Sequence, residues 1–138
     1  MNDLARRILA IEVARANAGE TPVDAAVQTC VRLQVPLSKF MGSVGFYSLL
    51  SRALVLGKAE APSLQVVYVQ PDGSLAGFDE FDQDQEAGEC EKGRVALVAH
   101  LLGLLGIFIG ESLALRIACD AWPDASIEKT DLKEEEKL

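Results

Sequence analysis

The sequence is poor in the side chains on which enzymes most often rely for catalysis. Its 138 residues include a single histidine, His100, and three cysteines, and aromatic residues make up only 6%. It has no zinc-ligand spacing, no nucleophile elbow and no glycine-rich loop that opens a helix. We therefore predict a protein that is not an enzyme, with no catalytic residue, no metal site and no cofactor.

We also expect no secretion signal in the first residues. Asp3 and two arginines interrupt the apolar positions there, which leaves no continuous apolar segment and no small-residue cleavage site. The cysteines are odd in number and follow no motif, a pattern typical of free thiols in a reducing compartment. They are Cys30, Cys90 and Cys119. We expect a protein of the bacterial cytosol.

Basic residues are few relative to acidic ones. The chain has 13 lysines and arginines against 21 aspartates and glutamates, a formal net charge of −8. Nucleic acids and anionic lipids attract lysine and arginine, so this balance argues against a general affinity for either. We expect no nucleic-acid partner, and we regard a membrane partner as unfavoured.

The segment from Arg94 to Trp122 is the most apolar part of the chain. No formal charge occurs from Val95 to Gly110, and apolar side chains there point in every direction around a helix. We predict one long helix, buried on most sides. The fold class is mainly α (α+β), with about four helices packed around this helix and one short β-hairpin. We expect a single domain over residues 1–123 and a charged tail over 124–138.

Small residues recur along this segment about every 3.6 positions, the period of a straight α-helix. They are Ala96, Ala99, Gly103, Gly106, Gly110, Ala114, Ala118 and Ala121. Each glycine costs roughly 1 kcal/mol relative to alanine in a helix interior. We therefore predict that another helix fills the groove, either residues 39–58 or a second copy across a dimer axis. On this hypothesis Gly106→Leu costs more than about 2 kcal/mol through overpacking.

The residues that we assign to helix packing or self-association form the middle of this stripe. They are Ala99, Gly103, Gly106, Gly110 and Ala114.

Three more helices are predicted before the long one. The first covers residues 3–18, with Glu12 among the residues of its solvent side, and stops before a glycine. The second starts after Thr21 and ends at Val35, because the residue before Pro36 is pushed out of the helical region. The third covers residues 39–58 and carries Phe40, Val44, Tyr47, Leu50 and Leu54 on one side.

A hairpin and an acidic loop complete the sequence. Residues 64–69 alternate in strand fashion, 71–74 have turn chemistry, and 75–78 return as a second strand, which we expect to lie on the helices. Residues 79–91 predict an acidic loop. Its acids resemble the first ligands of a calcium loop, but Ala87 and Gly93 replace the glycine and glutamate that such a loop needs, so we predict no calcium site.

His100 and Glu111 are the polar residues of interest in the long segment. A histidine inside an apolar run is most often satisfied by a core or helix–helix hydrogen bond. We predict such a role for His100, and for Glu111 an ion pair with an arginine such as Arg52 or Arg116 of the partner subunit. Both residues are candidates for a polar core contact or a partner contact. Cys90 is not a candidate nucleophile, because flanking glutamates disfavour its thiolate.

These observations favour a non-enzymatic interaction or regulatory module that self-associates, preferably as a homodimer, and that presents its acidic loop to an unknown protein partner. Two alternatives stay open. One is a membrane-inserting protein, although the uncharged run spans only about 24 Å against a hydrocarbon core of ~30 Å. The other is a small-molecule sensor with a pocket beside Phe108, His100 and Tyr47.

Overall fold

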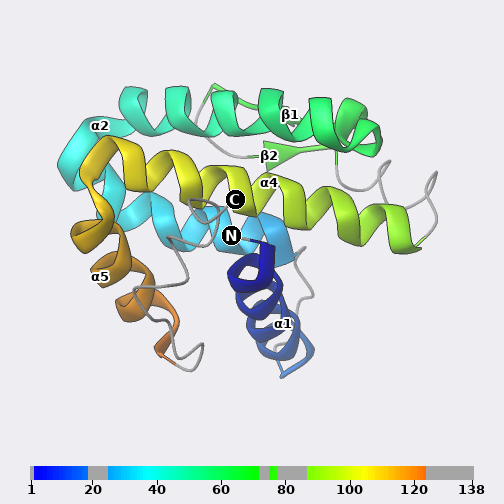
Figure 1. Ribbon diagram of the computed structural model, residues 1–138, viewed down its shortest axis with the longest axis horizontal. Helices are drawn as coiled ribbons and strands as arrows, with labels where there is room; N and C mark the ends of the chain where they lie inside the picture. The colour runs from blue at the N-terminus through cyan, green and yellow to red at the C-terminus, as the bar shows by residue number, and fades with distance from the viewer. Residues whose placement is uncertain (1, 19–24, 72–74, 78–86, 124–138) are drawn as a thin grey trace.

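The computed structural model describes residues 2–18, 25–71, 75–77 and 87–123. Within these ranges the chain forms four α-helices and one two-stranded antiparallel hairpin (Figure 1). The helices are α1 (Asn2–Ala18), α2 (Ala25–Glu60), α4 (Ala87–Ile109) and α5 (Glu111–Ala121), and the short elements are the 3-10 helix η1 (Pro62–Val66), β1 (Tyr68–Val69) and β2 (Leu75–Ala76). The predicted mainly α fold with one short hairpin is confirmed.

Helix α1 has the limits that its sequence predicts. It ends at Ala18, directly before the glycine that marks the stop. Leu4, Ala5, Ile8 and Leu9 are buried, at the spacing of one helical face. Through this face α1 packs on α2 and α4.

Helix α2 is not divided where the sequence predicts. The helix continues through Pro36 and is interrupted at Gly42, whose φ of 74° and ψ of 168° lie outside the helical region. Only glycine adopts this φ without strain, since it has no Cβ. The predictions that one helix ends at Val35 and that the next runs uninterrupted over 39–58 are therefore wrong. Figure 1 shows the result: α2 folds back on itself, and its two arms run in opposite directions.

The long C-terminal helix is also interrupted. α4 starts at Ala87, inside the segment predicted as an acidic loop, and ends at Ile109. Gly110 then has a φ of 88° and a ψ of 153°. This is again a conformation that glycine adopts without strain. The prediction of one continuous helix to Trp122 is wrong, because this turn directs α5 away from the line of α4 (Figure 1), while α5 still contacts α2 and α4.

The hairpin is shorter than predicted. Residues 62–66 form η1 instead of the start of a strand, with Pro62 in its first turn, a position that suits the fixed φ of proline. Tyr68 pairs with Ala76 and Val69 with Leu75. The hairpin lies on the helices as expected, since β1 contacts α2.

The core lies mainly between the second arm of α2 and α4, which pack side by side (Figure 1). Residues at helical spacing fill it from both sides. From α2 these are Phe46, Leu49, Leu50, Ala53 and Leu54, and from α4 they are Val95, Leu97, Val98, Leu101, Leu102 and Leu105. Trp122, at the C-terminal end of α5, is fully buried against the same core.

Candidate functional site

The stripe of small residues does not form one continuous groove. Ala99 and Ala114 are buried in the core, whereas Gly103 and Gly106 are half-buried and Gly110 is exposed. A Cβ atom added to any of these three glycines would meet no atom within 4 Å. No described helix of the same chain therefore packs on the glycines. The stripe is divided because the chain turns at Gly110, so that Ala114 no longer continues the line of α4.

The close contact between α2 and α4 uses a glycine of α2 instead. A Cβ atom on Gly57 would lie 2.9 Å from Cδ1 of Leu64 and 3.6 Å from Cα of Leu97. Gly57 thus allows the backbone of α2 to approach that of α4. The two segments that the sequence pairs do pack together, but through a different surface from the one predicted.

The apolar side predicted for residues 39–58 is only partly buried. Leu50 and Leu54 lie in the core, but Phe40, Val44 and Tyr47 are exposed. The break at Gly42 places Phe40 on the other arm of α2 from Leu50, while Val44 and Tyr47 lie on the arm of Leu50 but outside its buried face. Phe46 and Leu49 take the core positions instead.

Two more large apolar side chains are exposed near the end of α4, at the same end of the molecule. Gly57 of α2 is beside Leu97 of α4, and the two helices run antiparallel with the same rise of about 1.5 Å per residue. Tyr47 is therefore level with Ile107. The bend of α2 and the junction of α4 with α5 lie at the same end of the molecule (Figure 1).

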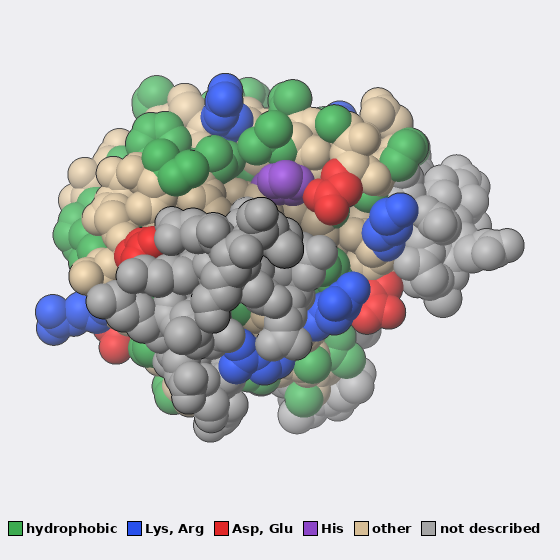
Figure 2. Space-filling view, in the orientation of Figure 1, with side chains coloured by type: hydrophobic (Ala, Val, Ile, Leu, Met, Phe, Trp, Pro, Cys, Tyr) green, Lys and Arg blue, Asp and Glu red, His purple; other side chains and the backbone are tan. Residues whose placement is uncertain are grey.

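We call the five exposed side chains at this end the bend patch. Its members are Phe40, Val44, Tyr47, Ile107 and Phe108. Ile107 is 80% exposed and Val44 79%. No charged residue occurs from Phe40 to Ser51 or from Val95 to Gly110. Over this part of α2 and α4, Figure 2 shows mostly hydrophobic and uncharged surface.

His100 connects α4 with the end of α2. Its Nε2 lies 2.7 Å from Oε2 of Glu60, and the side chains of the two residues are 32% and 48% exposed. His100 thus forms a contact between helices near the surface. Glu111 is half-buried at the first position of α5, where the helix dipole favours a carboxylate.

A buried polar cluster escaped the sequence analysis. Glu12 is only 1% exposed, although it was assigned to the solvent side of its helix. Nε of Arg32 donates to Oε1 of Glu12 at 2.6 Å and to Oε2 at 2.9 Å. Nε1 of Trp122 donates to Oε1 of Glu12 at 3.3 Å. One carboxylate therefore joins α1, α2 and the C-terminal end of α5.

The periodicity of α1 contained a signal for this cluster. Glu12 comes after Leu4 and Ile8 at intervals of four residues, which places it on the apolar face of the helix. A carboxylate on such a face needs buried donors. The donors come from positions far away in the chain, so the sequence pattern did not identify them.

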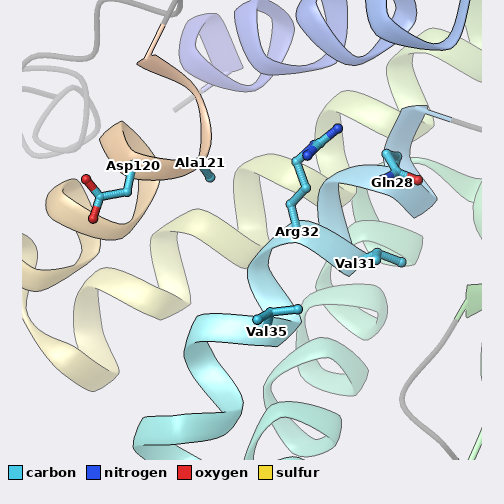
Figure 3. A pocket seen from close by; sticks show the side chains of 6 residues that line it. All are labelled: Gln28, Val31, Arg32, Val35, Asp120 and Ala121. Atoms are coloured by element: carbon cyan, nitrogen blue, oxygen red, sulfur yellow. The ribbon is translucent and has the colours of Figure 1, made fainter. Parts of the chain in front are cut away.

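A cavity of about 350 Å³ lies between the first arm of α2 and the end of α5, and not beside the residues predicted for a sensor pocket. Its lining consists of Gln28, Val31, Arg32, Val35, Asp120 and Ala121. Figure 3 shows the Arg32 side chain pointing toward α1 and Asp120 pointing away from it. The polar groups of the cavity therefore do not converge on one point, as those of a specific ligand site do.

The open space before Gly106 leads to a stability prediction. Gly106→Ala is expected to raise the free energy of unfolding of the single chain by up to about 1 kcal/mol, because alanine is the better helix former. Denaturant unfolding at low protein concentration measures this. The matched control is Gly57→Ala, which is expected to gain less than Gly106→Ala, because its Cβ would lie 2.9 Å from Cδ1 of the buried Leu64 and that side chain would have to shift.

A loss of stability in Gly106→Ala at low concentration would contradict the open space. The cost of more than about 2 kcal/mol predicted for Gly106→Leu requires an occupied groove. We do not expect that cost in the isolated chain.

Among residues 2–18, 25–71, 75–77 and 87–123, no three metal-binding side chains gather at one place. Comparison with protein families, curated proteins and solved structures found no match for this chain.

Proposed function

We propose that this protein is a non-enzymatic interaction module with a regulatory role, and that the bend patch is its binding surface. One observation carries the proposal: five large apolar side chains are exposed at the end of the molecule where α2 bends and α4 meets α5. From their exposed fractions they present on the order of 600 Å² to solvent. Monomeric proteins rarely expose contiguous apolar patches larger than a few hundred Å², and larger patches mark interaction sites.

The residue types in the patch are those that dominate protein interfaces. Aromatic side chains are enriched in the cores of interfaces, whereas lysine and glutamate are depleted. The patch contributes three aromatic rings, from Phe40, Tyr47 and Phe108, and contains no charge. Phe46 and Leu105, on the same helices, are buried in the core. This packing anchors in the core the two helices that carry the patch, so a partner does not have to order their backbone on binding.

A photo-crosslinking amino acid tests the proposal in the cells that produce the protein. Placed at Phe108, it is expected to form adducts with a protein, because this side chain lies within the proposed interface. The matched control is the same amino acid at Tyr68, an aromatic residue of β1 with similar exposure. The proposal fails if Phe108 yields no adducts, or no more than Tyr68 does.

Membrane insertion is the second candidate function. Two helices pass a test of length and composition for crossing a membrane: α2, which is interrupted at Gly42, and residues Glu91–Ile109 of α4. Only 33% and 50% of their apolar windows are buried inside the protein, whereas a core helix of a soluble protein is mostly buried. Flotation with neutral lipid vesicles, at neutral and acidic pH, tests this function. Protein that stays at the bottom of the gradient under both conditions rules it out.

A further inference from the structure

We infer that the bend patch binds a second copy of this chain, related to the first by a two-fold axis. The inference rests on the proposed function of the patch as a binding surface, and it specifies the partner. Its support comes from the area, the charge and the shape of the patch.

The area of the patch suits a small dimer. A standard interface buries about 800 Å² per partner. The bend patch supplies on the order of 600 Å² of this from apolar side chains. Exposed small residues next to it, Ser43, Ser48 and Gly110, extend the surface without adding charge. A symmetric contact across the patch therefore reaches the size of a stable interface.

The charge distribution favours a second copy of this chain as the partner of the bend patch. The chain has a formal net charge of −8, so two copies repel each other over most of their surfaces. The bend patch is the exception, since the parts of α2 and α4 that form it carry no charged residue. Two copies can meet there without placing like charges opposite one another. A basic partner would find no acidic side chain among the five residues of the patch to pair with.

A two-fold interface requires a self-complementary surface, and α4 offers both a projection and an open space for it. Ile107 projects from α4, and Gly103 lies one helical turn before it, with open space in front of its Cα. In a symmetric dimer Ile107 of each copy occupies the space over Gly103 of the partner subunit. Because of the two-fold axis, this contact between a projecting side chain and an open space forms twice in the dimer.

Light scattering and sedimentation of the purified full-length chain over a range of concentrations test the inference. The wild type is expected to have the mass of two chains. Ile107→Glu is expected to weaken the dimer at least about tenfold, because it places two carboxylates inside an apolar contact. Val13→Glu is the matched control: it adds the same charge at an exposed valine of α1, and it should leave the dimer intact.

A second variant tests the interface without changing charge. Gly103→Phe places a side chain in the hollow, since a Cβ atom added to Gly103 meets no atom within 4 Å. It is expected to yield monomers with a wild-type circular dichroism spectrum. A dimer that resists both Ile107→Glu and Gly103→Phe forms elsewhere on the surface, and that result would overturn the inference.

The outcomes separate this inference from the proposed function. If the wild type is monomeric at every concentration but Phe108 still crosslinks to a different protein, the inference fails and the proposed function stands. If the chain is monomeric and Phe108 gives no adducts, both fail. A monomer that binds neutral lipid vesicles, and loses this binding in Ile107→Glu, assigns the patch to a membrane and also overturns the inference.

Discussion

Replacing Trp122 with alanine is expected to lower the free energy of unfolding by about 3–5 kcal/mol. Trp122 is fully buried and is the largest such side chain among the described residues. It anchors the end of α5 to the core, and its Nε1 donates to Glu12 at 3.3 Å. Denaturant unfolding followed by far-UV circular dichroism measures the loss.

Trp122→Phe is the control for this prediction. Phenylalanine keeps most of the buried apolar area but removes the N–H donor, so a smaller loss of about 1–2 kcal/mol is expected. Wild-type stability in Trp122→Ala would show that the end of α5 does not contribute to the core. Equal losses in the two variants would assign the effect to the hydrogen bond and not to packing.

Arg32→Ala is expected to destabilise the protein by about 3 kcal/mol, and Glu12→Ala by only about 2 kcal/mol. The difference arises from unequal burial, since the Glu12 side chain is 0% exposed and that of Arg32 33%. When Arg32 is removed, the Glu12 carboxylate stays inside the protein but loses both of the hydrogen bonds that Arg32 donates to it. When Glu12 is removed, the guanidinium of Arg32 can bind water.

Fluorescence of Trp122, the single tryptophan of the chain, reports unfolding in both variants. The control is Gln28→Ala, one turn earlier on α2, which is expected to change stability by no more than about 0.5 kcal/mol. A larger loss in Glu12→Ala than in Arg32→Ala would show that burial does not decide the energy of this pair.

The elements with a strong local pattern were predicted well. The apolar period and the terminal glycine define α1 to within one residue, and turn residues flanked by alternating side chains locate the hairpin. Both signals act over a few residues, which is the range that sequence rules cover.

The helix breaks were not predicted, because local rules give proline more weight than glycine. Pro36 was expected to end a helix, yet the helix continues through it and breaks at Gly42. Gly110 was expected inside a helix, yet it ends α4. A glycine permits a break without requiring one. At Gly110 the packing of Trp122 requires the break, since this side chain reaches the core only if α5 turns back.

The candidate site results from these two breaks. The sequence identified Phe40, Val44 and Tyr47 as one apolar face but assigned it to the core, and it identified Gly103 and Gly106 as a groove for a helix of the same chain or of its copy. In the structure the apolar face is exposed, and no described part of the chain fills the space before the glycines. Hydrophobic character alone does not tell whether a surface is buried within the chain or against a partner.

Helix content, the hairpin and the uncharged apolar segments are properties of neighbouring residues, and the order of amino acids was enough to establish them. The burial of Glu12, the exposure of Ile107 and the meeting of the two bends depend on contacts between distant residues. Glu12 and Trp122 are 110 positions apart in the chain. Many arrangements of the chain agree with the same local preferences, and they differ in how the elements pack. Contacts between distant residues therefore follow from the three-dimensional fold and not from the local sequence.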